Sequence, residues 1–228
     1  MSADMLILAV EQSTDTGSVA ILKDGKILGE REWDGLLLRS CGLFACLKEL
    51  LAATALDLMD ISRFVVDVGP GSYSGLRSSF AAVRAFALPE KQPVYALTSA
   101  ETLAFEIMEE FPDDLVQVVG DARRQQIWSC VYKRNGRTPA AQSKIQLAAE
   151  NDFQPAPGAL VVSPDWKRLG AKLKTFIAGG TRLLEMPRAP KAGCLGRLAF
   201  QKMQLNIPGE PLSPIYLHAA VGSVKRNQ

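Results

Sequence analysis

Histidine is almost absent from this sequence, since His218 is the only one among 228 residues. The four cysteines, Cys41, Cys46, Cys130 and Cys194, form no CxxC pair and no cluster with histidine. This pattern predicts neither a zinc site nor a redox motif, and we expect the cysteines to be reduced and mostly buried. A single histidine also argues against a Ser-His-Asp triad.

An excess of charge of either sign is lacking too, because 26 basic and 24 acidic residues leave a net charge of +2. Proteins dedicated to nucleic acids usually carry a basic surface, so direct binding of tRNA or DNA is not indicated. The first apolar run, Met5 to Val10, is too short to span a bilayer and follows no basic leader. We expect a cytoplasmic protein that does not associate with membranes.

The first half of the chain reads as alternating strands and helices. An apolar strand at residues 6–10 precedes two strands around Asp24-Gly25, a dipeptide that favours a tight hairpin and so predicts three consecutive antiparallel strands. Thr98 and Glu101 stand at capping-box spacing before a helix. The other expected elements are helices at 36–53, 74–88 and 99–110, and strands at 64–68 and 94–97.

The same pattern then restarts. Glu11 precedes Gly25 by 14 positions and Asp121 precedes Gly136 by 15, so an acidic strand end and a hairpin turn recur together. We predict a duplicated α/β fold, although two hairpins with such turns could also resemble each other by chance.

Two lobes follow from this duplication, covering residues 1–110 and 111–228. The second lobe is harder to interpret beyond residue 133. The elements expected there are strands at 159–163 and 175–180 and helices at 166–173 and 194–205.

A glycine-rich loop joins the strand at 64–68 to the helix at 74–88. It consists of Gly69, Pro70, Gly71, Ser72, Tyr73, Ser74 and Gly75. Its spacing misses the GxGxxG dinucleotide motif, it has no Walker lysine, and Tyr73 occupies the nucleophile position of GxSxG. The helix N-terminus could bind an anion, whereas the small residues of the helix equally suit close packing in the core or against a partner. These three interpretations stay open from the residues alone.

The segment "AVEQSTDTGSVAIL" offers a second candidate site. Actin-like phosphotransferases position a metal and a terminal phosphate with acidic and hydroxyl residues at such a hairpin. The candidates are Glu11, Ser13, Thr14 and Asp121. The alternative is that these side chains only stabilise turns. Arg123 and Arg124 beside them could meet a phosphate or an acidic partner, or could form a solvated strand edge.

Five segments together resemble a known family. They are "LILAVEQSTDTGSVAIL", "GPGSYSGLRSSFAAVRAFAL", "PVYALTSAETLA", "GDARRQQIWSCVY" and "SPIYL". In order and spacing they are similar to the TsaB (YeaZ) family of bacteria, well over residues 5–133 and weakly in the last third. The most specific element is the glycine loop with the Leu-Arg that follows it.

This resemblance implies two actin-like, ribonuclease-H-like lobes, each with a mixed sheet flanked by helices. It implies a noncatalytic subunit that binds and activates the related enzyme TsaD, together with the ATPase TsaE, in forming threonylcarbamoyladenosine on tRNA. It also implies a homodimer when the protein is alone and contact with tRNA only through the complex. No cofactor is required, although ATP or ADP with Mg could bind at a subunit boundary. The implied interface residues are Leu43, Leu47, Leu76, Ser79, Phe80 and Val83.

Several residues depart from the family pattern. Glu11 replaces a usual Asp, Arg39 a common His, and Tyr73 and Ser74 the common Phe and Thr. The first helix also lacks the histidines of the TsaD metal site, so we expect no metal there. The rival hypothesis is an actin-like ATPase or small-molecule kinase that uses Glu11 and Asp121 near a metal-nucleotide. A protease acting on a partner is a third hypothesis, but no nucleophile and base are paired in the sequence.

Overall fold

The first sheet contains five strands in the order β3-β2-β1-β4-β5. The computed structural model describes residues 4–38, 41–176 and 181–218. The strands are β1 (Leu6–Glu11), β2 (Thr16–Lys23), β3 (Lys26–Asp34), β4 (Arg63–Asp67) and β5 (Val94–Leu97). β1, β2 and β3 are antiparallel neighbours, as predicted, whereas β4 runs parallel to β1 and β5 parallel to β4.

The second sheet repeats this plan, with the order β8-β7-β6-β10-β11. Its strands are β6 (Leu115–Arg123), β7 (Gln126–Asn135), β8 (Thr138–Ala141), β10 (Leu160–Val162) and β11 (Arg182–Leu183), and β9 (Gln146–Ala149) pairs with β7 as an addition. β6, β7 and β8 are antiparallel, and β10 runs parallel to both β6 and β11. The matching strand order and direction confirm the predicted duplicated α/β fold.

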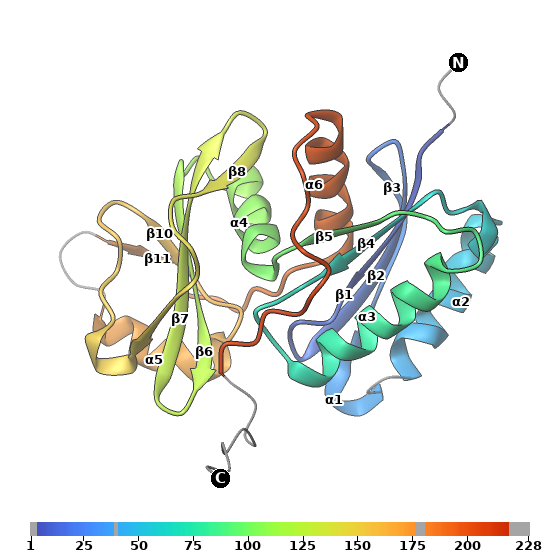
Figure 1. Ribbon diagram of the computed structural model, residues 1–228. Coiled ribbons are helices and arrows are strands. Elements are labelled where there is room, and N and C mark those ends of the chain that lie inside the picture. The colour runs from blue at the N-terminus through green and yellow to red at the C-terminus, as the bar shows by residue number, and fades with distance from the viewer. Residues whose placement is uncertain (1–3, 39–40, 177–180, 219–228) are drawn as a thin grey trace, which may run out of the picture.

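Helices cover both faces of the first sheet (Figure 1). The helices of the chain are α1 (Gly35–Leu38), α2 (Cys41–Thr54), α3 (Tyr73–Ala87), α4 (Ser99–Glu110), α5 (Trp166–Phe176) and α6 (Ala192–Gln204), with short 3-10 turns η1 (Leu58–Asp60) and η2 (Glu150–Asp152). Alternate side chains of β1 point to opposite faces. Leu8 and Val10 pack with α2 and α3, while Ile7 and Ala9 pack with α6.

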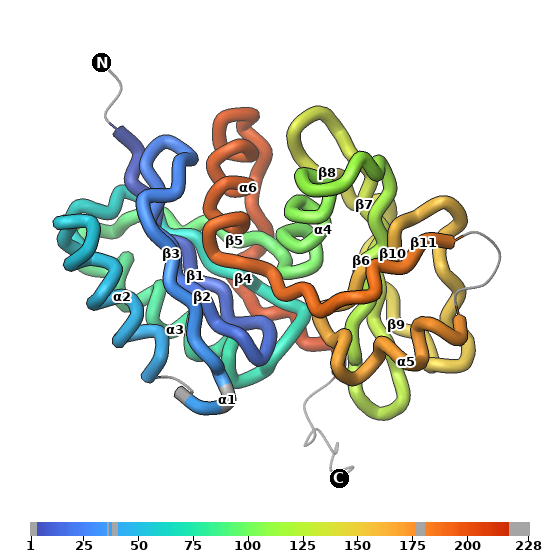
Figure 2. The backbone as a smooth tube through the Cα atoms, turned by 180° about the vertical axis from the view of Figure 1, so that it is seen from behind, coloured from blue at the N-terminus to red at the C-terminus, as the bar shows by residue number. Residues whose placement is uncertain are grey.

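The two halves of the chain exchange one helix each. α4 follows the first sheet in sequence but packs in the core of the second sheet, and α6 follows the second sheet but covers the first. α4 and α6 lie side by side between the sheets (Figure 2). A buried ion pair between Lys202 Nζ and Glu101 Oε1, 2.7 Å apart, joins them. The packing units therefore differ from the expected division after residue 110.

Two expected elements need correction. The single helix expected at 36–53 is replaced by α1 and α2, and Arg39 lies outside the described residues. In place of the strand expected at 175–180, Thr175 and Phe176 belong to α5, and residues 177–180 lie outside the described ranges. The helix continues because Phe176 extends its apolar stripe and packs against Phe153.

The cysteines are free, as expected, but they are not mostly buried. Only Cys130 is buried, because Cys46 and Cys194 are partly exposed and Cys41 is exposed. Cys41 begins α2, on the side of the helix that faces away from the sheet. In the described parts of the chain, no helix combines the length and apolar character needed to cross a membrane.

Candidate functional site between the lobes

The glycine loop, residues 69–75, packs against the turn between β1 and β2. A Cβ atom on Gly71 would lie 2.3 Å from the Ser13 carbonyl oxygen, and one on Gly75 would lie 2.0 Å from that of Gln12. The Ser72 amide donates to the Ser13 carbonyl at 2.7 Å. Glycine is required where two backbones approach this closely. Close packing therefore accounts for the glycines at positions 71 and 75.

The same loop starts α3 and contacts the start of α4. The Ser72 hydroxyl accepts from the Gly75 amide at 3.3 Å, which is an N-cap for α3. From the other side, the Ser99 hydroxyl donates to the Pro70 carbonyl at 2.7 Å. The loop is therefore bonded to elements on both sides, while the Tyr73 side chain stays 58% exposed.

Two fully buried carboxyl groups lie beneath this contact. Glu11 Oε1 accepts from the Ser13 amide and Asp67 Oδ1 from the Gly69 amide, both at 2.7 Å. Their other oxygens, Glu11 Oε2 and Asp67 Oδ2, have no hydrogen-bond partner among the described residues. Burial raises the pKa of Asp67 to about 6. Burial, and then the neighbouring Asp67, raise the pKa of Glu11 well above its usual range, so the pair holds a proton more tightly than isolated carboxyls would.

Asp67 is a residue that the sequence analysis missed. The available signal was an acidic side chain ending the otherwise apolar strand "FVV", directly before the glycine loop. Such a residue is seldom buried unless it is paired. Its position corresponds to that of Glu11 on the neighbouring strand, since β1 and β4 are parallel.

A cavity of about 420 Å³ lies between the lobes beside the glycine loop. It brings together Ser13, Thr14 and Asp121, three of the four predicted nucleotide-binding residues, with loop residues Pro70 to Tyr73. Glu11 is fully buried and does not line this cavity. The charged groups in the lining are Asp15, Asp121, Asp165, Arg123 and Arg168, in addition to His218.

Asp121 is already engaged by two arginines. Its Oδ2 lies 3.2 Å from Arg123 Nη1 and 3.3 Å from Arg168 Nε, and its Oδ1 accepts from the Arg123 amide at 2.7 Å. A cation at Asp121 would compete with both guanidinium groups. The described residues contain no group of three or more His, Cys, Asp or Glu side chains arranged to hold a metal ion.

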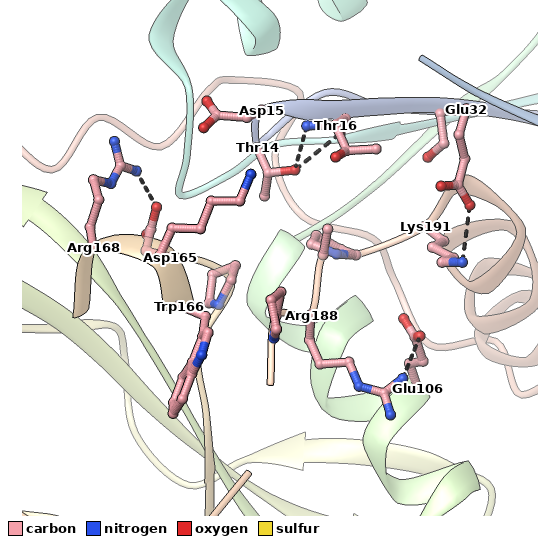
Figure 3. A pocket seen from close by; sticks show the side chains of 16 residues that line it. Thr14, Asp15, Thr16, Glu32, Glu106, Asp165, Trp166, Arg168, Arg188 and Lys191 are labelled. Atoms are coloured by element: carbon pink, nitrogen blue, oxygen red, sulfur yellow. Dashed lines mark hydrogen bonds and ion pairs between the residues drawn. The ribbon is translucent and has the colours of Figure 1, made fainter. Parts of the chain in front are cut away.

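A second cavity of about 350 Å³ lies on the other side of the β1–β2 turn and shares Thr14, Asp15, Asp165 and Arg168 with the first. Figure 3 shows Thr14 and Asp15 on one side of it and Asp165 on the other. Its remaining charges are mostly paired. Lys191 Nζ lies 3.0 Å from Glu32, and Arg188 contacts Glu106 and Glu110. The two cavities together form a cleft between the lobes.

The six predicted interface side chains lie in the interior of the first lobe, which corrects that choice of residues. Leu43, Leu76, Ser79 and Val83 are 0% exposed, Leu47 is 5% exposed and Phe80 is 7% exposed. They face the sheet because the apolar stripe of each helix packs on its own sheet. Leu47 also borders a surface groove, whereas the other five offer no surface to a partner while the lobe keeps this fold.

The outer side of the same helices carries a different apolar surface. A groove of about 530 Å³ runs along α2 and the turn that follows it, and Phe44 in its lining is 54% exposed. The groove is lined by Phe44, Leu47, Lys48, Leu51, Ala52, Ala55, Leu56 and Asp57. The Phe44 ring meets Phe86 of α3 edge to face, with centroids 6.1 Å apart. We call this surface the α2 groove.

Comparison with known proteins gives consistent matches. The family model described as "TsaD: tRNA N6-adenosine threonylcarbamoyltransferase" matches residues 42–189. The chain is 31% identical over 133 residues to the Bacillus subtilis protein named "tRNA threonylcarbamoyladenosine biosynthesis protein TsaB", a match that covers 58% of this chain and 57% of that protein. The Escherichia coli protein of the same name is 26% identical over 174 residues, covering 72% and 73% of the two chains.

Solved structures show the same fold. The structure titled "YeaZ from Pseudomonas aeruginosa" superposes with a TM-score of 0.80 at 20% identity, covering 93% of this chain and all of that one. A component of an (R)-2-hydroxyglutaryl-CoA dehydratase from Acidaminococcus fermentans reaches 0.52 at 12% identity, covering 88% and 99%. The two-lobed architecture is thus shared with YeaZ and with more distant proteins.

Proposed function

Because the chain belongs to the family described as TsaD, tRNA N6-adenosine threonylcarbamoyltransferase, and within it to the TsaB (YeaZ) group, we propose that it acts in threonylcarbamoyladenosine biosynthesis. Its role there is that of a noncatalytic subunit that binds and activates a TsaD-type enzyme. A TsaE-type ATPase is the third component, and tRNA contacts this chain only through the complex.

The observation that carries the proposal is the α2 groove. Large exposed apolar side chains that share a groove mark sites of protein association. Phe44 lines the groove and is 54% exposed, and Leu88, which directly follows α3 outside the groove, is 74% exposed. The buried face of these helices stabilises the lobe, so their outer face is free to bind a partner without unfolding it.

We assign the groove to a TsaD-type protein because the matching family model covers α2 from Gly42 onward. A protein built on the same plan has a corresponding helix on its first sheet. Two such faces can pack against each other in a nearly symmetric way. The same geometry would let two copies of this chain form an isologous homodimer in the absence of TsaD.

The test is to mix the purified chain with its cognate TsaD and to measure the complex by size exclusion and calorimetry. We expect a complex at micromolar concentration, and we expect Phe44→Glu to weaken it by about 30-fold or more, as for an aromatic contact worth about 2 kcal/mol. Leu147→Glu on β9 is the matched control, because Leu147 is 42% exposed on the other lobe. No complex, or an equal loss in both variants, would refute the assignment.

A second candidate function is an actin-like ATPase or small-molecule kinase. The cavity between the lobes favours it, since Ser13, Thr14 and Asp121 line one space of nucleotide size. The burial of Glu11 and the two arginines on Asp121 weigh against it. Calorimetry with ATP and Mg distinguishes the two functions, because tight binding abolished by Asp121→Ala would favour the enzyme. Nucleotide bound only in the presence of TsaD would instead indicate a site at the subunit boundary.

A further inference from the structure

The segment that follows α6 returns to the first lobe. We call residues 207–218 the C-terminal strap. The Tyr95 hydroxyl donates to the Ile207 carbonyl at 2.6 Å, and the Glu210 amide donates to the Ala96 carbonyl at 2.9 Å. A Cβ atom on Gly209 would lie 2.9 Å from the same Ala96 oxygen. The strap therefore lies directly against the backbone of β5.

Farther along, successive residues of the strap contact different lobes. The Ile215 amide donates to the Val68 carbonyl at 2.8 Å, and its side chain packs on the core of the first lobe. Two residues later, Leu217 packs on the core of the second lobe. His218 Nε2 lies 2.6 Å from the Ala122 carbonyl at the end of β6. Figure 1 shows this segment running in red from α6 across β5 toward the lower end of β6.

The strap also forms part of the wall of the 420 Å³ cavity between the lobes. Ile215, Tyr216, Leu217 and His218 all line it. The centroid of the Tyr216 ring lies 5.2 Å from that of Tyr73, which belongs to the glycine loop and lines the same cavity. The chain thus closes part of its own cavity with its own C-terminal residues.

We propose that the C-terminal strap is an intramolecular clamp that holds the two lobes together and keeps the cavity between them closed. Its two ends contact different lobes, so any separation of the lobes must break the contacts of at least one end. The hydrogen bonds of Glu210 and Ile215 secure the first lobe, and Leu217 with His218 secures the second. Release of either end opens the cavity. This inference does not depend on the proposed partner.

The experiment releases each end separately. Leu217→Asp places a charge against the second core, and Gly209→Val drives a branched side chain into the backbone of β5. Leu212→Ala is the control, since Leu212 lies in the same strap and is 49% exposed. Two readouts are needed, namely hydrogen exchange of the Ile215 amide and the radius of gyration from X-ray scattering of the full chain.

For both strap variants, but not for the control, we expect the Ile215 amide to exchange at least about tenfold faster and the radius of gyration to rise. Unchanged exchange at Ile215 in Leu217→Asp would show that the two ends act independently and would overturn the clamp. Faster exchange with an unchanged radius would overturn it as well, because the lobes would then stay closed without the strap. Circular dichroism checks folding, and if one variant fails to fold the other tests the clamp from the opposite end.

Discussion

Replacing Asp67 by Asn should stabilise this protein at neutral pH, although Asp67 is fully buried and hydrogen bonded. Burial raises the pKa of Asp67 from 3.8 to about 6. The native state therefore binds a proton more tightly than the unfolded state between these values. Stability falls as pH rises through this window, because the native carboxyl must ionise at a cost that the unfolded one does not bear.

The size of the effect follows from the shift. A change of one pKa unit corresponds to about 1.4 kcal/mol, so a shift of about two units costs the native state about 3 kcal/mol at neutral pH. An asparagine avoids this cost. Its Oδ1 can still accept from the Gly69 amide, and its Nδ2 can donate to Glu11. About 3 kcal/mol is the upper bound, since Glu11 remains buried in the variant.

The assay is urea unfolding of both proteins at several pH values from 4 to 8. The quantity to compare is the difference in free energy of unfolding between the variant and the wild type at each pH, because the contributions of other titrating groups then cancel. We expect a difference near zero at pH 4 that grows to as much as about 3 kcal/mol in favour of Asp67→Asn at pH 7.5. Asp152→Asn, at an exposed position, is the control and should show no such trend. A variant less stable than the wild type at pH 7.5, or a difference independent of pH, would refute the reasoning.

Two further substitutions test the packing between elements. Lys202→Met should lower the free energy of unfolding by about 3–5 kcal/mol at pH 7.5, because Glu101 would be left buried without its partner. The loss should shrink at lower pH, since burial raises the pKa of Glu101 and its protonated form tolerates burial; a pH-independent loss would contradict this. Gly75→Ala should lower the free energy of unfolding by about 1–3 kcal/mol or more, because its Cβ would meet the Gln12 carbonyl. Gly136→Ala is the control and should lower it by about 1 kcal/mol, because no atom lies within 4 Å of its Cβ. Equal losses in urea unfolding would argue against the close contact.

The sheets could be predicted from the sequence because their signals are local. The β2–β3 hairpin, for example, depends on the two-residue turn Asp24-Gly25 and on the apolar runs beside it. The exchange of α4 and α6 could not be predicted in this way. It depends on contacts such as the one between Glu101 and Lys202, which are 101 residues apart, and no periodicity in either helix identifies the sheet that it will cover.

The site was predicted in part. Ser13, Thr14 and Asp121 do meet at one cavity, because the duplication places the β1–β2 turn of the first lobe opposite the end of β6 in the second. The interface residues were predicted wrongly, because periodicity identifies an apolar stripe on a helix but not whether its own sheet or a partner covers that stripe. Phe80 was predicted to contact a partner but packs on its own sheet, whereas Phe44, which was not predicted, is exposed.

The exchanged helices have a consequence for biosynthesis. The face of β1 that carries Ile7 and Ala9 is covered by residues 192–204, which leave the ribosome only after all strands of the second sheet. Until then the nascent first sheet displays one apolar surface to solvent or to a chaperone. A chain shortened after residue 110 should consequently aggregate, and the two repeats can no longer be produced as independent proteins.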